Sequence, residues 1–169
     1  MHRGQAADIC GIQHQVERAI QVRDLKSYLS GCWRIDRSML DRRASACGSM
    51  SGQARFSPDG SWLTYREWGK LSFGNYEGAA EQRYDLEFSS STDRALVRFR
   101  DGRRFHLLDL SEGITEVTHV CGADFYAGRF VALDHQHWQS AWEVSGPRKD
   151  TQIITLYSRQ PSEAPPQAL

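Results

Sequence analysis

The side chains best suited to catalytic chemistry in this sequence are two histidines and a cysteine in its second half. His119 and Cys121 are separated by one residue, so they lie on the same face if the segment is a strand. A histidine close to a thiol can generate a nucleophilic thiolate, and an imidazole can also act as a general acid or base. His106 is a third candidate for this chemistry. Because zinc takes three or four ligands and no spacing supplies them, we predict no metal site.

A second set of candidates combines an ionisable pair with tyrosines. Arg37 and Glu67 either pair with each other or meet a ligand, because buried charges need a partner. Tyr65 and Tyr126 either donate to an oxyanion that develops during a reaction or are core aromatics whose hydroxyls reach the backbone. The sequence leaves both alternatives open.

Short alternating runs must position these residues. From Gly31 onward, apolar and polar residues alternate in brief segments that turn signals separate, such as Ser57-Pro58-Asp59-Gly60 and Asp101-Gly102. Eight to ten such segments follow one another with no helical pattern between them. This pattern predicts a mainly β protein: a single antiparallel up-and-down β-barrel of eight to ten strands, in which a small ligand can fit.

Strand parity predicts which side chains enter the barrel. If Trp33 points inward, so does Arg37, and a two-residue turn at Asp101-Gly102 places Phe99 and His106 on one inward face. The predicted ligand-binding residues are Arg37, Tyr65, Glu67, Phe99, His106, His119, Cys121, Tyr126 and Trp142. Of these, His106, His119 and Tyr126 are the candidates for catalytic roles.

Both ends of the chain differ from the central region. Residues 1–28 form an N-terminal helical segment in our interpretation, with a helix over about 12–27 that carries Ile12, Val16, Ile20 and Leu25 at helical spacing. Its apolar stripe would dock on one end of the barrel or on a second copy, which would make a homodimer. The barrel is expected to span residues 29–159, and the Pro-rich residues 160–169 to be a disordered tail.

The overall charge excludes some partners. The chain has 169 residues, with 21 Lys and Arg against 21 Asp and Glu. A net charge of zero argues against nucleic acid as the main partner. No apolar run is long enough to cross a bilayer and no apolar stretch follows the N-terminus, so we expect no membrane partner and a cytoplasmic location.

Two groups of residues resemble known families. Gly31-x-Trp33, together with Arg159 near the end of the last strand, resembles the lipocalin (calycin) signature, which implies that the Trp plugs one end of the barrel and the Arg packs across it. Residues 29–159 also resemble an uncharacterised family of bacterial and fungal domains of unknown function. That resemblance rests on Gly31-x-Trp33, Tyr65-x-Glu67-x-Gly69-x-Leu71, Phe99-x-Asp101-Gly102-Arg103-x-Phe105-His106-x-Leu108-Asp109, His119-x-Cys121-x-x-Asp124-x-Tyr126 and Trp142-x-Val144-x-Gly146-Pro147-Arg148-Lys149-Asp150.

We therefore expect a small-molecule-binding barrel, whose ligand is partly aromatic or hydrophobic and anionic. One alternative is an enzyme of the isomerase, cyclase or hydrolase type that uses histidine and tyrosine as acid–base groups. A second is a haem-binding barrel with His106 or His119 as axial ligand, although no cofactor is predicted. A third is a structural barrel that dimerises through its N-terminal segment.

Overall fold

Ten antiparallel strands and one short helix make up the part of the chain that the computed structural model describes, residues 18–161. The elements are α1 (Leu25–Leu29), β1 (Gly31–Asp41), β2 (Ala46–Asp59), β3 (Trp62–Phe73), β4 (Tyr76–Glu87), β5 (Arg94–Phe99), β6 (Arg104–Asp109), β7 (Ile114–Cys121), β8 (Asp124–Ala132), β9 (His137–Ser145) and β10 (Asp150–Arg159). The predicted mainly β composition is confirmed.

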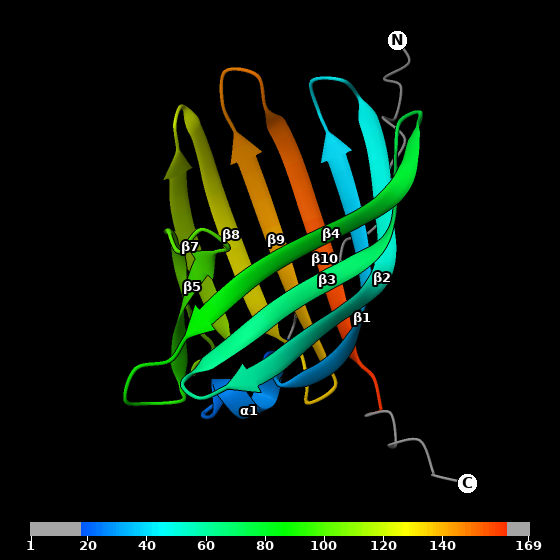
Figure 1. Cartoon of the computed structure of the whole chain (residues 1–169). Helices are drawn as coiled ribbons and strands as arrows, with labels where there is room; N and C mark the ends of the chain where they lie inside the picture. Colours follow the sequence, from blue (N-terminus) through cyan, green and yellow to red (C-terminus); the bar gives the residue numbers. More distant parts are fainter. Residues whose placement is uncertain (1–17, 162–169) are drawn as a thin grey trace, which may run out of the picture.

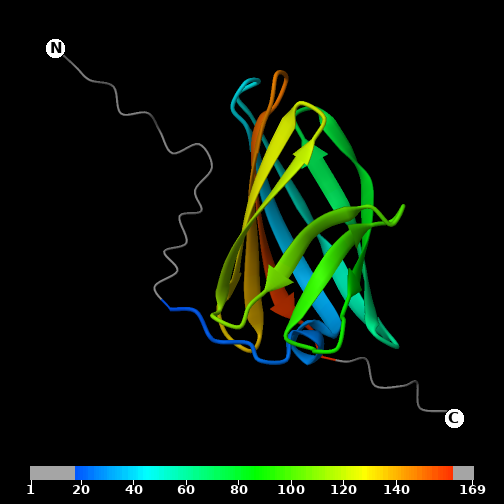
Figure 2. The same ribbon diagram turned by 90° about the vertical axis from the view of Figure 1, so that its left-hand side faces the viewer.

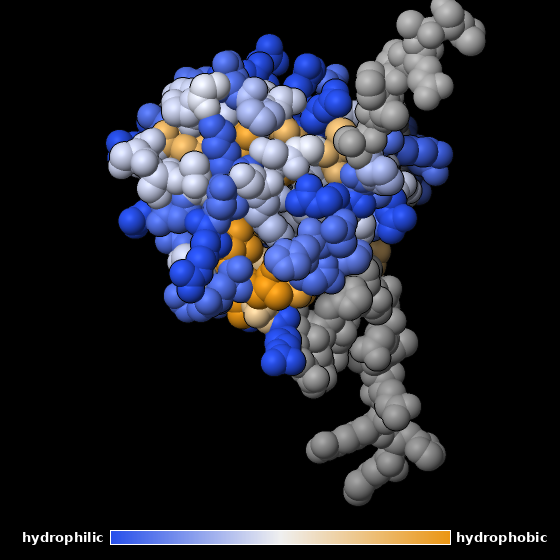
Figure 3. Space-filling model, turned by 90° about the horizontal axis from the view of Figure 1, so that it is seen from below, coloured by the Kyte–Doolittle hydropathy of each residue, from blue (hydrophilic) through white to orange (hydrophobic). Residues whose placement is uncertain are grey.

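The strands form one nearly closed up-and-down barrel. Each strand pairs with its neighbour in sequence except β6 with β7, and β1 also pairs with β10, which gives the order β6-β5-β4-β3-β2-β1-β10-β9-β8-β7. The loops that join β1 to β2, β7 to β8 and β9 to β10 lie at one end, the open end. The other end, the closed end, carries α1 together with the loops that join β2 to β3 and β8 to β9 (Figures 1 and 2). Seen from the closed end, the surface is mostly hydrophilic with small apolar patches (Figure 3). Among residues 18–161, no helix is long and apolar enough to span a membrane.

Trp33 plugs the closed end of the barrel, as the lipocalin resemblance implies. It is fully buried and donates from Nε1 to the Leu29 carbonyl at 2.8 Å. The Arg159 guanidinium lies over its ring, 4.2 Å from the ring centroid. Arg159 also donates to the carbonyls of Ser30, at 3.0 Å, and Tyr28. One cation thus covers the plug and ties the end of α1 to the last strand.

The N-terminal helix is much shorter than predicted. Residues 12–17 lie outside the described residues, and the chain from 18 to 24 is not helical. The backbone amides of Ile20 and Val22 instead donate to the carbonyls of Ala132 and Leu110, both at 2.9 Å, so these residues line up along the closed end of the barrel. The helix begins only after Asp24, whose side chain caps the Ser27 amide at 3.0 Å.

The short helix packs onto the barrel of its own chain. Leu25 and Leu29 are fully buried there and Tyr28 is 9% exposed. The apolar face of α1 is therefore covered by the barrel of its own chain. Ile12 and Val16 of the predicted stripe lie outside the described residues, and the homodimer stays a prediction.

The predicted two-residue turn at Asp101-Gly102 is wrong. The Phe99 amide donates to the Arg103 carbonyl at 2.9 Å, which makes a three-residue loop that ends at Gly102, where φ is +85°. The register then shifts: Val97 faces His106 as predicted, but Arg98 faces Arg104. Phe105 is the extra residue of a β-bulge, so it and His106 are both able to face the interior.

Replacing Arg159 tests how the closed end of the barrel is held together. We expect Arg159→Met to lower the free energy of unfolding by about 2–3 kcal/mol, because buried carbonyls lose their donor. Arg34→Met is the matched control, since this side chain is 59% exposed in a surface ion pair and should change stability by less than about 0.5 kcal/mol. Urea unfolding measures both variants. Equal losses would contradict the role of Arg159.

Candidate functional site

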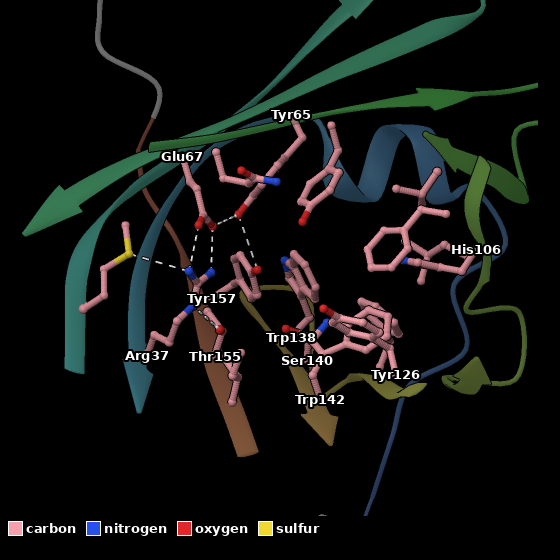
Figure 4. Close-up of a pocket in the computed structure, with 18 of the residues that line it drawn as sticks. Arg37, Tyr65, Glu67, His106, Tyr126, Trp138, Ser140, Trp142, Thr155 and Tyr157 are labelled. Atoms are coloured by element: carbon pink, nitrogen blue, oxygen red, sulfur yellow. Dashed lines mark hydrogen bonds and ion pairs between the residues drawn. The ribbon is translucent and has the colours of Figure 1, made fainter. Parts of the chain in front are cut away.

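The barrel encloses a cavity of about 380 Å³. It is lined by side chains from β1 to β6 and from β8 to β10. Six of the nine predicted ligand-binding residues line it: Arg37, Tyr65, Glu67, His106, Tyr126 and Trp142. Figure 4 shows the Arg37–Glu67 pair on one side of the cavity and His106 on the other, with Trp138 between them. The cavity is large enough for a small organic molecule.

An ion pair dominates the polar side of the cavity. The Arg37 guanidinium donates from Nη1 and Nη2 to the two carboxylate oxygens of Glu67, both at 2.7 Å. Its Nε donates to Thr155 Oγ1 at 2.8 Å. The side chains of Arg37 and Glu67 are 17% and 5% exposed. Of the two alternatives that the sequence left open, the structure shows the internal pair, held in the bidentate geometry that satisfies both partners.

Two tyrosines extend this pair into a network. Tyr65 donates its hydroxyl to Glu67, and the Tyr157 hydroxyl lies 3.4 Å from that of Tyr65. Burial raises the pKa of both phenols, and the negative charge of Glu67 reinforces this shift. Both hydroxyls are therefore protonated hydrogen-bond donors at neutral pH.

Aromatic rings form the opposite wall. Trp142 stacks on Phe105, with 5.1 Å between ring centroids and 10° between planes, and packs edge-on against Phe130 at 5.6 Å. Gly128 makes room for this arrangement, because a Cβ there would lie 2.6 Å from the Trp142 ring. The wall thus offers a flat apolar surface to a ligand.

His106 faces the same wall as a neutral imidazole. It is 8% exposed, packs 5.0 Å from Phe130, and its Nδ1 lies 3.2 Å from the Leu107 carbonyl. Since a carbonyl only accepts, Nδ1 carries the proton and Nε2 is an acceptor. Burial lowers the pKa of His106 to about 4, and nearby His119 adds a smaller effect in the same direction.

The remaining predicted residues lie outside the cavity. Phe99 and His119 pack together at 5.5 Å, and both rings contact Phe105. Cys121 ends β7 and is exposed, whereas the imidazole of His106 is buried. Within residues 18–161, no group of three or more His, Cys, Asp or Glu side chains is arranged to hold a metal ion.

Several lining residues were missed by the sequence analysis. Trp138, Ser140, Thr155 and Tyr157 come from β9 and β10. The alternation in these segments gave the signal, since Trp138 shares a face with Trp142. Phe105 was missed for a different reason: only the bulge in β6 brings it inward.

A comparison with protein families gives a match over residues 29–159, to a family of unknown function, DUF6314. This chain belongs to that family. No curated protein matches it. The membership covers the whole barrel and confirms the resemblance to a family of unknown function.

The DUF6314 barrel is also similar to solved structures at low sequence identity. An S-type phycobiliprotein lyase from Guillardia theta matches with a TM-score of 0.62 and 10% identity, over 85% of this chain and 95% of the lyase. A protein of unknown function from the DUF3598 family of Nostoc punctiforme matches with a TM-score of 0.55 and 13% identity, over 86% of this chain and 51% of that protein. At these identities the similarity is one of fold.

Removing one partner of the buried pair tests its energetics. We expect Glu67→Gln in this DUF6314 protein to cost about 3–5 kcal/mol in the free energy of unfolding, because Arg37 is left buried without a countercharge. The double variant Arg37→Met/Glu67→Leu should be more stable than Glu67→Gln, since it removes both charges. Chemical unfolding of the three proteins gives the comparison. A double variant less stable than the single one would contradict this interpretation.

The pH dependence of stability tests the burial of His106. The unfolded histidine has a pKa near 6.5 and the folded one about 4, so the unfolded state binds more protons between these values. The stabilising contribution is complete above pH ~6.5, and about 3 kcal/mol is lost as the pH falls to ~4. His106→Phe should flatten this part of the profile, whereas His135→Phe, at an exposed side chain, should not. Identical slopes in both variants, from urea unfolding at each pH, would argue against a neutral buried His106.

Proposed function

We propose that this DUF6314 chain is a small-molecule-binding protein whose barrel holds a flat, aromatic, uncharged ligand. The observation that carries the proposal is the cavity of about 380 Å³, with an aromatic wall on one side and a saturated polar network on the other. An apolar surface with few polar groups is typical of sites for such ligands. The similarity of fold to a phycobiliprotein lyase is consistent with a barrel that receives a ligand.

The charge balance favours a neutral ligand over the anionic one expected from the sequence. Arg37 was the cation expected to bind an anion, but both carboxylate oxygens of Glu67 already occupy it. At the open end, Lys149 pairs with Asp124 at 2.6 Å and donates to the Tyr126 hydroxyl at 3.2 Å. An anion would therefore have to displace an existing partner.

The ionisation of His106 favours binding over acid–base catalysis. A general base works best when its pKa lies near the working pH. With a pKa of about 4, His106 is a weak base that holds a fixed tautomer, which suits an acceptor for a ligand donor. Haem ligation by His106 or His119 stays a prediction, and a Soret band after haem is added would support it.

A titration with prodan, a neutral dialkylamino-naphthyl ketone with environment-sensitive fluorescence, tests the proposal. We expect prodan to bind with enhanced emission, and Trp142→Ala to weaken its affinity at least tenfold because the stacking surface is lost. Trp68→Ala is the matched control, since Trp68 is 44% exposed on the outer face and should leave the affinity unchanged.

The matching dimethylamino-naphthoate, which carries a carboxylate in place of the ketone, tests the charge class. It should bind at least tenfold more weakly than prodan. Tighter binding of the carboxylate would overturn the neutral-ligand proposal. Binding of both compounds that is insensitive to Trp142→Ala would place them outside this cavity.

A further inference from the structure

One residue that lines the cavity carries a polar side-chain atom that has no hydrogen-bond partner in the described part of the chain. The indole Nε1 of Trp138 makes no hydrogen bond within residues 18–161. Bulk water cannot take the place of a partner, because the residue is only 3% exposed and the nitrogen is buried. Trp138 lines the cavity and lies between the Arg37–Glu67 pair and His106 (Figure 4). A buried N–H without an acceptor is costly, so folded proteins rarely leave one without a reason.

The ring of Trp138 is held in place on several sides. It stacks on Tyr157 with 3.6 Å between centroids and 4° between planes, and it packs edge-on against Trp33 and Phe56, both at 6.2 Å. Its backbone lies between Ala132 of β8 and Tyr157 of β10. The indole therefore cannot turn to seek another acceptor without breaking this packing.

No acceptor that lines the cavity receives this N–H among residues 18–161, and two of these acceptors are already in use. The Glu67 carboxylate accepts from Arg37 and Tyr65, and the Thr155 hydroxyl accepts from Arg37. Among residues 18–161, the other buried side-chain atom without a partner is Gln139 Oε1. It belongs to the next residue of β9, which points to the opposite face. Gln139 does not line the cavity, so it cannot serve the indole.

We infer that the Trp138 Nε1–H is the donor that recognises the ligand, and that the ligand is a flat aromatic compound with a carbonyl or similar acceptor directed at this atom. The inference rests on the proposed function and adds the polar group of the ligand to it. The acceptor enters at the inner end of the cavity, near the Trp33 plug, while the aromatic part of the ligand lies against Trp142. The free-energy cost of burying this N–H is offset only when such an acceptor is bound.

Two ligands that differ only in the ketone test this inference. Wild-type protein should bind prodan about tenfold more tightly than the parent dimethylaminonaphthalene, which lacks the ketone, because one hydrogen bond contributes about that factor. Trp138→Phe removes the donor but retains an aromatic ring, so it should abolish this preference while the parent compound still binds. Trp68→Phe is the matched control: it makes the same change at an indole that is 44% exposed on the outer face, and it should preserve the ketone preference.

A measurement on the wild-type protein avoids any effect of the substitution on folding. The indole N–H proton of Trp138, assigned by NMR from its absence in Trp138→Phe, should shift on addition of prodan and not on addition of the parent naphthalene. Equal affinities of the two compounds in wild type, or a ketone preference that survives in Trp138→Phe, would overturn the inference and leave the proposed function intact. If neither compound binds to wild type, the proposed function itself fails.

Discussion

The pairing of the first strand with the last one determines what the interior of this protein can be. β1 and β10 are antiparallel neighbours over nine residue pairs from Trp33↔Arg159 to Asp41↔Thr151. This register sets Trp33 beneath Arg159 and places Arg37 opposite Thr155, whose hydroxyl accepts from it. A slip of one residue would turn every side chain of β1 to the other face. Both the plug and the polar side of the cavity therefore depend on one ladder.

The polar network within the barrel is closed on itself. Arg37 and Glu67 cancel each other's charge, and Tyr65 and Tyr157 complete the hydrogen bonds. Burial lowers the pKa of Arg37, but the hydrogen bonds and charge of Glu67 outweigh it, so the net shift is upward and the guanidinium stays charged. What the cavity offers to a ligand is then set by its aromatic surfaces and by single neutral groups such as His106 and Trp138.

Strand parity explains how much of the site could be predicted from sequence. In β1, where the pairing is regular, alternation correctly placed Arg37 in the interior. In β3 both faces carry aromatic residues, so the inward placement of Tyr65 and Glu67 rested on the family resemblance. At the hairpin of β5 and β6 alternation placed His106 correctly but missed Phe105, because a three-residue loop that ends at Gly102 and a bulge at Phe105 change the register. The predicted helix is absent over residues 18–24 for another reason. The backbone amides of Ile20 and Val22 donate to carbonyls of the barrel instead of to carbonyls within a helix.

Side-chain partnerships were beyond the reach of parity. Alternation indicates that Trp138 and Trp142 share a face, but it does not show that one ring stacks on Phe105 and the other leaves its N–H without an acceptor. Those facts depend on the distances across the barrel, which involve strands far apart in the sequence.

The barrel wall also has a seam. β6 and β7 are the two ends of the strand order, and no ladder joins them in the described part of the chain. Near the open end, rings bridge the seam instead: His119 of β7 packs edge-on against Phe105 of β6 at 5.1 Å. Ring contacts can separate and re-form without breaking backbone hydrogen bonds. The seam is therefore the place where the barrel wall can open at the lowest free-energy cost, and it lies beside the aromatic surface against which a ligand would bind.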